Sequence, residues 1–454
     1  MRVVICGDFL FSGRNLVERI DPKLVELLQS ADAVFANAEF STPEVDTPPG
    51  FTMYLTSVHP DTLDEFTDLN IKIINFANNH TVDYGWEGCL QTIEAAEKRK
   101  LLACGIGRNL SDARKGKFLD LKGGRIGCVA ASSTWAYRAL GADGSADTVA
   151  RPGLAPLRWD HKYVLPEDMF NQIKEMDEAL GTRASMDETG RVETWDPQPE
   201  NRIKFGSAME HFLVIERGEK PEVKTWCNPE DEDALLRSIR DASRRSDYVI
   251  ATVHSHEGKN ENWYSDYSPE FMESFARHAI DAGADVFVGH GAHYPRGVEI
   301  YKGKPIFYDV GSFVMEFESG NSMISPEMYH TYHLPADSYP SDLHGFRAKF
   351  EDGSWKGFYA ERRFSEHFVV IVDINEETQQ AEYCLLPIDT DMQRDNPIKR
   401  GLPWVASHEV GRKLASDMNK RSEPYGTIFS YDEESGVIRF QGPDSYRKES
   451  LDHR

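Results

Sequence analysis

The segment at residues 289–293, which reads Gly-His-Gly-Ala-His, is the sharpest chemical signal in this sequence. Glycines on both sides of the first histidine allow a tight loop that can pack both imidazole rings around one ion. Histidines that merely filled a core would not need such a loop. We therefore predict that His290 and His293 are metal ligands.

A second histidine pair lies in the segment His-Ser-His-Glu at residues 254–257. Residues two apart on a strand project to the same face, so both imidazoles can reach one site. We predict that His254 is a metal ligand and that His256 serves in acid–base catalysis, with Glu257 beside it in the substrate pocket. The alternatives are a supporting role for His256 and Glu257 behind the ligands, or two histidines on a solvated strand end.

The segment Asn-Asn-His at residues 78–80 combines an amide with an imidazole. An asparagine amide oxygen is a neutral hard ligand, and the adjoining histidine can protonate a leaving group. Asp83 lies three residues further on, where it can orient that imidazole. We predict that Asn79 is a metal ligand and that His80 is a general acid supported by Asp83. The alternative is an asparagine-rich turn that caps the following helix.

Two carboxylates and one arginine complete the set of candidates. Asp8 follows Gly7, where glycine lets the backbone approach a bound group closely, and we predict that Asp8 is a metal ligand or an acid–base group. Glu39 can bridge two ions about 3.5–4 Å apart. Taken alone, Asp8 also fits turn chemistry and Glu39 an ordinary surface residue. Arg296 can bind an anionic group of the substrate bidentately, or pair with a structural carboxylate.

The predicted ligands share one feature, because each group of them follows a hydrophobic run that predicts a buried strand. In α/β sheets, ligands bind just beyond the carboxyl ends of the strands. If the five strands share an edge, their polar side chains converge on one point. Carboxylate, amide and imidazole together accommodate one or two divalent ions of manganese, iron, zinc or calcium. The five segments span residues 3–8, 34–39, 73–80, 248–256 and 286–293.

The rest of the chain alternates strand and helix patterns, which predicts an α/β fold with a largely parallel sheet covered by helices. We expect one domain at residues 1–392 and a C-terminal extension at 393–454 packed on it. Two stretches without periodicity, at about 141–205 and 316–345, predict irregular insertions; the second is a lid, a binding loop or a surface excursion. Further predicted elements are helices at 86–100, 167–180, 231–243, 268–283 and 407–420, strands at 126–131, 368–374 and 382–388, and a hairpin at 426–440.

Composition narrows the classes of partner. The formal charge of −24 with no basic stripe argues against nucleic acid, so we expect a small-molecule or peptide substrate, itself anionic and drawn in by metal and local arginines. No apolar run is long enough to span a membrane, and the N-terminus lacks a secretory pattern, so we expect a cytoplasmic protein. The six cysteines are scattered, which indicates reduced thiols.

Several sequence blocks follow one another in a set order along residues 1–390: Gly7-Asp8, Asn-Ala-Glu at 37–39, residues 77–85, His254, residues 289–293, residues 296–299 and residues 301–308. Together they resemble the CapA/PgsA family, the poly-γ-glutamate capsule biosynthesis group within the calcineurin-like metallophosphatases. The resemblance implies a four-layer α/β/β/α sandwich with a metal site at one sheet edge.

The resemblance also implies roles for individual residues. Asp8 would bind the first ion, His293 would close that first site, and Glu39 would lie between the ions. His80 would be the general acid. The second site would be completed by Asn79, His254 and His290.

Three positions depart from the pattern of the metallophosphatases. Leu10 stands where the first motif usually has a histidine. His290 and His293 are three residues apart, where the usual spacing is two. Ser312 occupies the place of a usual asparagine. One hard ion, or one tight and one weak site, is therefore an alternative to a full dinuclear centre.

Three functions fit these residues. The first is a metal-dependent hydrolase of a phosphoester or of a γ-glutamyl or peptide amide, with metal-activated water and a histidine general acid. The second is a metal-dependent peptide epimerase that uses histidine and aspartate acid–base pairs, as some proteins resembling this family do. The third is a non-catalytic component of poly-γ-glutamate synthesis or export.

Overall fold

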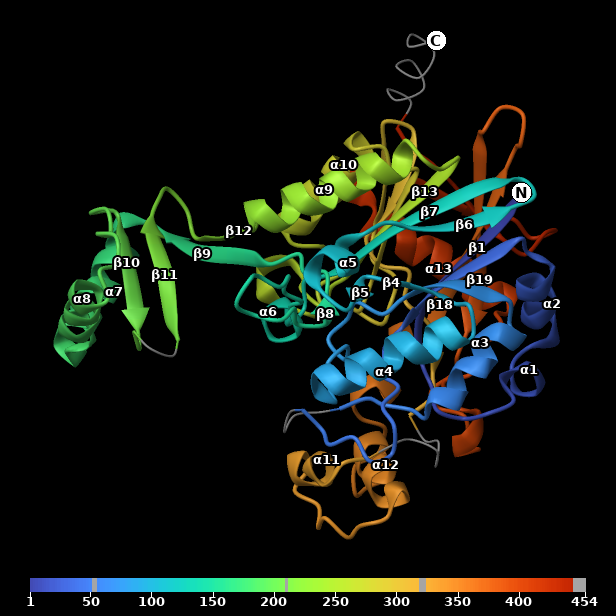
Figure 1. The fold of residues 1–454 in the computed structure, drawn as a ribbon, viewed down its shortest axis with the longest axis horizontal. Coiled ribbons are helices and arrows are strands. Elements are labelled where there is room, and N and C mark those ends of the chain that lie inside the picture. Colours follow the sequence, from blue (N-terminus) through green and yellow to red (C-terminus); the bar gives the residue numbers. More distant parts are fainter. Residues whose placement is uncertain (51–54, 209–210, 318–323, 444–454) are drawn as a thin grey trace.

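Two stacked β-sheets form the centre of the molecule (Figure 1). The computed structural model describes residues 1–50, 55–208, 211–317 and 324–443. Within these residues the larger sheet has ten strands in the order β21-β22-β19-β18-β1-β2-β3-β4, with β17 beside β1 and β20 beside β19. The bounds are β1 Arg2–Leu10, β2 Ala33–Ala38, β3 Ile71–Asn75, β4 Leu102–Cys104, β17 Ser312–Met315, β18 Glu366–Ile374, β19 Ala381–Asp389, β20 Trp404–Val405, β21 Ile428–Tyr431 and β22 Ile438–Gln441.

The second sheet has the order β15-β16-β14-β13-β7-β6. Its central strands β16, β14, β13 and β7 run parallel, and β15 and β6 pair antiparallel at the two edges. The carboxyl ends of the parallel strands therefore lie at one end of the sheet, as they do for β1, β2 and β3 in the first sheet. The bounds are β6 Lys117–Leu121, β7 Gly124–Ser132, β13 Tyr248–His254, β14 Val286–His290, β15 Val298–Tyr301 and β16 Lys304–Phe307.

Helices cover the outer face of each sheet (Figure 1). Apolar side chains of four helices pack on the larger sheet, and those of α9 and α10 pack on the smaller one. The predicted four-layer α/β/β/α sandwich is therefore confirmed. The helices are α1 Leu16–Arg19, α2 Pro22–Ser30, α3 Asp64–Asp68, α4 Gly85–Lys98, α9 Pro229–Ser243 and α10 Glu270–Asp281.

Strand β1 shows why the hydrophobic runs are continuous. Val4 and Cys6 belong to the core under the helices, while Val3 and Ile5 face the second sheet. Because both faces of the strand are buried, alternation of polar and apolar residues is lost. The six cysteines are all free, as the scattered spacing predicts.

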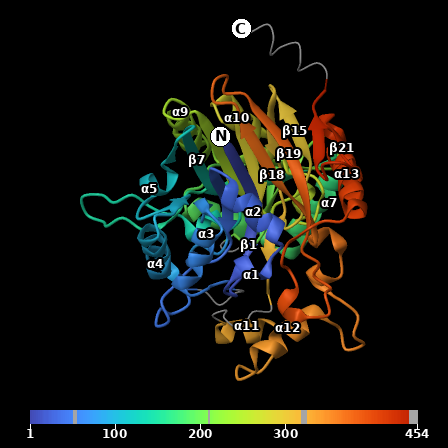
Figure 2. The ribbon, with the colours of Figure 1, turned by 90° about the vertical axis from the view of Figure 1, so that its right-hand side faces the viewer.

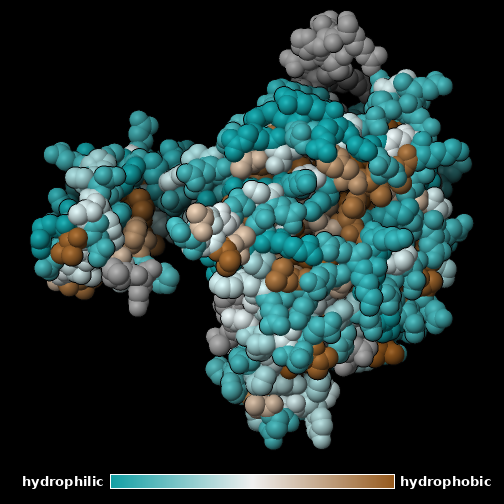
Figure 3. All heavy atoms as spheres, in the orientation of Figure 1, coloured by the Kyte–Doolittle hydropathy of each residue, from teal (hydrophilic) through white to brown (hydrophobic). Residues whose placement is uncertain are grey.

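The first predicted insertion is wrong in its detail. The helix at 167–180 forms as α7 Glu167–Leu180, but the stretch also contains a second helix and strands that continue to Cys227. These strands form a separate sheet in the order β10-β11-β9-β12, and Figure 1 and Figure 3 show it as a lobe beside the sandwich. The added elements are α8 Thr182–Val192, β9 Trp159–Leu165, β10 Arg202–Gly206, β11 Phe212–Arg217 and β12 Glu222–Cys227, with β5 Ile106–Gly107, β8 Gly153–Leu154, α5 Leu110–Arg114 and α6 Ala136–Ala139 near its base.

The second predicted insertion is also more regular than expected. It contains α11 Pro326–Thr331 and α12 Pro340–Ala348, which lie together below the sandwich in Figure 2, while residues 318–323 are outside the described residues. The predicted tail forms as α13 His408–Arg421 and the β21–β22 hairpin, which joins the larger sheet through β19. Residues 444–454 are not described. No helix in the described part of the chain has the length and apolarity needed to cross a bilayer.

Candidate metal centre

The predicted ligands converge where the carboxyl ends of both sheets meet. Asp8 and Asn37 are register partners on β1 and β2 of the larger sheet. His254 and His290 are register partners on β13 and β14 of the smaller sheet. The expectation that all five strands share one sheet edge is therefore corrected, because the site lies between the two sheets.

A first group of donors consists of Asp8, His254 and His290, all fully buried. Oδ1 of Asp8 lies 3.6 Å from Nδ1 of His290 and 4.0 Å from Nδ1 of His254. The two histidine Nδ1 atoms are 3.0 Å apart. Three donor atoms at these separations can surround one cation.

A second group consists of Glu39, His256 and His293. Oε1 of Glu39 lies 3.5 Å from Nε2 of His256, and Oε2 lies 3.6 Å from Nδ1 of His293. The groups touch, because Nε2 of His256 is 3.1 Å from Nε2 of His254. His293 also lies 3.2 Å from Oδ2 of Asp8. His256, expected in acid–base catalysis, thus stands among the candidate ligands.

The loop after β14 depends on unusual backbone angles. Gly291 has φ of 116°, and a Cβ at this position would lie 3.1 Å from the ring of His254. His293 itself adopts a φ of 63°, in the left-handed region that side chains disfavour. The carboxylate of Asp309 accepts hydrogen bonds from the backbone N–H groups of Ala292 at 2.8 Å and Gly311 at 2.7 Å. This carboxylate holds the strained loop in place.

Asparagine side chains support the carboxylate of Asp8. Nδ2 of Asn37 donates to Oδ1 of Asp8 at 2.8 Å, and Nδ2 of Asn75 donates to Oδ1 of Asn37 at 2.8 Å. Asn78 donates to the backbone carbonyl of Ala38 at 2.7 Å. By contrast, Oδ1 of Asn79 is buried and has no hydrogen-bond partner in the described part of the chain. An amide oxygen left in this state is suited to bind a cation.

The carboxylates are held in an environment that disfavours several negative charges. Burial raises the pKa of Glu39 well above its usual value, and repulsion from Asp8 adds to the shift. Burial likewise raises the pKa of Asp309 to about 7, again with repulsion from Asp8. Burial opposes the charge of Asp8 as well, but the hydrogen bond and charge of His293 keep the pKa of Asp8 below its ordinary value.

Three of the imidazoles, those of His254, His256 and His290, are neutral bases in this environment. Burial lowers the pKa of His254 and His256 well below the usual value, and repulsion between neighbouring imidazoles lowers it further. Burial lowers the pKa of His290 to about 4. A neutral imidazole keeps a lone pair for a metal, so these rings can act as ligands at neutral pH.

The two donor groups fit a divalent cation. Oε2 of Glu39 and Oδ1 of Asn79 are both buried, and neither has a hydrogen-bond partner within residues 1–50, 55–208, 211–317 and 324–443. Buried carboxylates that lack a counter-charge are costly, and a cation would compensate them. Imidazole and carboxylate are the ligands of zinc, manganese and iron sites, whereas calcium prefers oxygen donors alone.

His80 and Asp83 form a pair on the wall of the site. Nδ1 of His80 lies 2.6 Å from Oδ2 of Asp83, and the backbone N–H of Thr56 donates to the same oxygen at 2.7 Å. Nε2 of His80 lies 3.3 Å from Oγ1 of Thr56. The carboxylate therefore fixes the orientation of the ring, as the spacing of these residues predicts.

A cavity of about 230 Å³ opens over the second donor group. Glu39, Asn79, His80, His256 and His293 reach it. Most of the remaining wall is aromatic, so the cavity can exclude water from a bound substrate. That wall consists of Leu10, Trp135, Trp263, Tyr264, Phe317, Tyr332, Arg347 and Phe358.

Two predicted substrate contacts are corrected by the structure. Nη1 of Arg296 donates to the backbone carbonyl of Glu257 at 2.6 Å, and Nη2 donates to those of His256 and Trp263 at 3.2 and 3.0 Å. The carboxylate of Glu257 accepts from the hydroxyls of Ser133 and Ser255 at 2.6 and 2.8 Å. Neither residue lines the cavity, and both hold the loop that carries His256.

Sequence reasoning missed several residues of the site. Asp309 follows the short strand β16, so the rule that found the other carboxylates could have found it. Asn37 was visible only as a neighbour of Glu39. The aromatic wall and Arg347 have no local signal, because they come from loops and from α12, far apart in sequence.

Comparison with known proteins identifies a family. The family model described as bacterial capsule synthesis protein PGA_cap matches residues 2–316. An uncharacterized protein of Sinorhizobium fredii, y4sH, is 27% identical over 96% of this chain and 92% of its own length. The PGA biosynthesis protein CapA of Bacillus subtilis is 25% identical over 59% of this chain and 48% of its own length.

Other similarities are weaker. A probable polyglutamine synthesis accessory protein of Mycobacterium tuberculosis is 26% identical over 58% of this chain and 50% of its own length. Among solved structures, a phosphatase from Mycoplasma pneumoniae has a TM-score of 0.40 at 14% identity, covering 86% of this chain and 93% of its own. A putative 5'-nucleotidase from Staphylococcus aureus has a TM-score of 0.37 at 11% identity, covering 88% of this chain and 56% of its own.

Proposed function

The chain belongs to the PGA_cap family of bacterial capsule synthesis proteins, and from that premise we propose that it is a metal-dependent hydrolase. One observation carries the proposal: two touching groups of carboxylate and imidazole donors, all buried except the partly buried His256, lie beside a histidine–aspartate pair at one cavity. A purely structural cluster would not need His80, whose ring reaches the cavity wall.

The two donor groups would supply the ligands for one or two divalent ions. Asp8, His254 and His290 would hold one ion, and Glu39, His256 and His293 the other, with Asn79 adding its amide oxygen. The excess of imidazole favours manganese, iron or zinc over calcium. A bound ion supplies Lewis acidity, which activates water and neutralises charge that develops on the substrate.

The chain's own residues complete the chemistry. His80 donates a proton from Nε2 to the leaving group when its ring is doubly protonated, and Asp83 orients the ring by accepting the hydrogen bond from Nδ1. The aromatic wall excludes bulk water, which strengthens the electrostatic interactions inside the cavity. Arg347, which also reaches this cavity, provides positive charge for an anionic substrate. Substrates are a phosphoester or a γ-glutamyl or peptide amide.

The test is hydrolysis of two probe classes by protein loaded with Mn²⁺, Fe²⁺ or Zn²⁺. Bis(p-nitrophenyl) phosphate represents phosphoesters, and γ-glutamyl-p-nitroanilide represents amides. We expect His80→Ala to lower turnover by about 10²–10⁴ with unchanged metal content. His278→Ala is the matched control, because this histidine lies on α10 and pairs with Glu232 away from the cavity. Equal turnover of His80→Ala and wild-type protein would contradict the role.

A second candidate, peptide epimerisation, is favoured by one specific observation. The cavity wall carries two histidine–aspartate contacts, His80 with Asp83 at 2.6 Å and His293 with Asp8 at 3.2 Å. Removing and returning a proton at an α-carbon requires two such acid–base groups. Deuterium incorporation from heavy water without cleavage of the peptide, together with one equivalent of bound calcium, would support this candidate over hydrolysis.

A further inference from the structure

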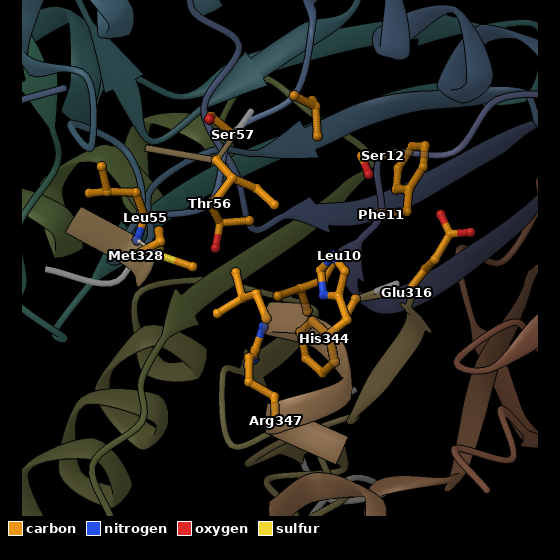
Figure 4. A pocket seen from close by; sticks show the side chains of 14 residues that line it. Leu10, Phe11, Ser12, Leu55, Thr56, Ser57, Glu316, Met328, His344 and Arg347 are labelled. Carbon is orange, nitrogen blue, oxygen red and sulfur yellow. Dashed lines mark hydrogen bonds between the residues drawn. The ribbon is translucent and has the colours of Figure 1, made fainter. Parts of the chain in front are cut away.

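A second, smaller cavity shares part of its lining with the one at the metal centre. Figure 4 shows the side chains that line this smaller cavity. Its volume is about 40 Å³, enough for a water molecule or a small functional group. Leu10, Phe317 and Arg347 line both cavities, so the two are neighbours across a shared wall. Leu10 is also the residue that replaces the usual histidine of the first metallophosphatase motif. A substrate at the metal centre therefore lies close to this second space.

His344 lines the smaller cavity with an unsatisfied ring. Its side chain is 8% exposed, and both ring nitrogens are buried without a hydrogen-bond partner among the residues that the structure describes. Burial, with the charge of Arg347, lowers the pKa of this histidine to about 4, so the ring is neutral at pH 7. A buried polar group with no partner costs free energy, and natural proteins rarely keep one without a purpose.

Arg347 supplies the positive charge at the boundary between the cavities. It lies one helical turn after His344 on α12, so both side chains project from the same face. The guanidinium carbon is 4.7 Å from the ring centre of Phe317 and 5.7 Å from that of Tyr332. Both rings belong to the aromatic wall of the larger cavity, and they fix the guanidinium there.

Among the described residues, the other charged side chain in the lining, that of Glu316, does not oppose an anion. Glu316 pairs with Arg19, and its Oε2 accepts from the backbone N–H of Gly13 at 2.9 Å. Its negative charge is thus compensated within the wall. Ser12 and Thr56 add hydroxyl groups to the lining (Figure 4). An apolar group in this space would leave both ring nitrogens of His344 unsatisfied, whereas a group with oxygen acceptors would accept a hydrogen bond from its N–H.

We propose that this small cavity is a subsite for a carboxylate group of the substrate, with Arg347 providing the charge and His344 a hydrogen bond. The proposal rests on the proposed function, because the reacting group of the same molecule would lie at the metal centre. It defines the substrate class: the bond that reacts has a carboxylate a few bonds away. The small volume excludes a bulky or branched anion from this subsite.

Tethered ligands test the proposal in metal-loaded protein. We choose phosphonoacetate, 3-phosphonopropionate and 4-phosphonobutyrate, in which a phosphonate for the metal centre carries a carboxylate at increasing distance. Propylphosphonate and 3-phosphonopropanamide serve as the uncharged counterparts, because each has a neutral group in place of the carboxylate. Calorimetry measures binding, so the readout does not depend on turnover. We expect one carboxylate ligand to bind at least about tenfold more tightly than both uncharged counterparts.

Two substitutions identify the residues responsible. Arg347→Met keeps an aliphatic chain between the aromatic rings, and His344→Leu keeps the volume of the ring. We expect each to reduce about tenfold the preference for the carboxylate ligand over propylphosphonate, and His344→Leu to change the binding of propylphosphonate less than twofold. Arg412→Met is the control, since Arg412 is an exposed arginine on α13 that pairs with Glu433. A preference that persists in both variants, or is absent at every linker length in wild-type protein, overturns the proposal.

Acetate separates failure of the subsite from failure of the metal centre. In protein treated with chelator, acetate is titrated while the ring resonances of His344 are followed, with His344→Leu used for assignment. A saturable shift that Arg347→Met abolishes supports the subsite even if no phosphonate binds, in which case only the metal centre fails. No shift in wild-type protein contradicts the subsite. If acetate shifts the His344 resonances but the tethered carboxylates bind no more tightly than their uncharged counterparts, a free carboxylate binds there. The substrate assignment is then wrong.

Discussion

The Nδ1 atoms of His254 and His290 lie 3.0 Å apart, although the two residues come from different strands of a parallel sheet. Register pairing of β13 with β14 places them side by side, and burial lowers the pKa of both rings. With Oδ1 of Asp8 close to both, the arrangement is the one that a shared cation requires.

Removing metal is expected to destabilise the protein. The buried carboxylates and imidazoles of the two donor groups would lose their compensating charge, so a chelator should lower the melting temperature. Adding Mn²⁺ or Zn²⁺ at about 100 times its dissociation constant should restore about 2.7 kcal/mol of stability. Differential scanning calorimetry measures both steps. In His254→Ala the response to added metal should be small, and a full response there would argue against the first donor group.

Asp83→Asn is expected to impair turnover less than His80→Ala does. The amide can keep a hydrogen bond to Nδ1 of His80, but it no longer fixes one tautomer of the ring. We expect turnover to fall about tenfold to a hundredfold, with metal content unchanged. Steady-state kinetics on the better probe substrate, with elemental analysis of the same sample, measures the effect. A loss of metal in this variant would place Asp83 among the ligands.

Arg296→Met is expected to act on stability and metal retention before it acts on substrate binding. The guanidinium is buried and holds three backbone carbonyls of the loop that carries His256. Leaving these carbonyls without donors should cost about 3 kcal/mol in the free energy of unfolding. Arg237→Met on the surface of α9 is the control. If Arg296→Met raises only the KM, with stability intact, the residue contacts substrate after all.

Stability is expected to fall as the pH is lowered. Burial lowers the pKa of His344 to about 4 and that of His367 to about 3, against about 6.5 for the unfolded chain. Below about pH 6.5 the unfolded chain therefore takes up protons that the folded chain does not. The folded state, in which these two rings are buried and neutral, is therefore most stable above this pH. Its free energy of unfolding falls progressively as the pH falls toward 4. Urea unfolding of chelator-treated protein at several pH values measures how the free energy of unfolding changes with pH.

The variant His344→Leu isolates one of these two histidines. Its free energy of unfolding should depend less steeply on pH, with a difference from wild type on the order of 2 kcal/mol near pH 4.5. An identical pH dependence in variant and wild type would show that His344 is solvated in the folded protein.

Much of the fold follows from hydrophobic patterning. The strands that carry Asp8, Glu39 and His254 are apolar on both faces because each lies between a helix layer and another sheet. The lobe escaped prediction because its strands are only half buried and its core is small, centred on Phe170 and Ile215. Short amphipathic strands of this kind resemble irregular sequence.

The candidate site was predictable where a polar residue follows a buried strand. That rule brought together Asp8, Glu39, His254 and His290 across the gap between two sheets. It does not give the direction of a side chain, so Arg296 was expected to face substrate when it in fact points back at the loop. Residues from distant insertions, such as Arg347, become visible only in three dimensions.

The metal content of the protein tests the central claim most directly. Wild-type protein, purified without chelator or nickel affinity, is compared by elemental analysis with an Asp8→Ala/Glu39→Ala double variant that is folded by circular dichroism. We predict one or two equivalents of manganese, iron or zinc in the wild type, and a small fraction of that in the variant. Wild-type protein that neither contains nor takes up a divalent ion, or a variant that retains as much, would contradict the account.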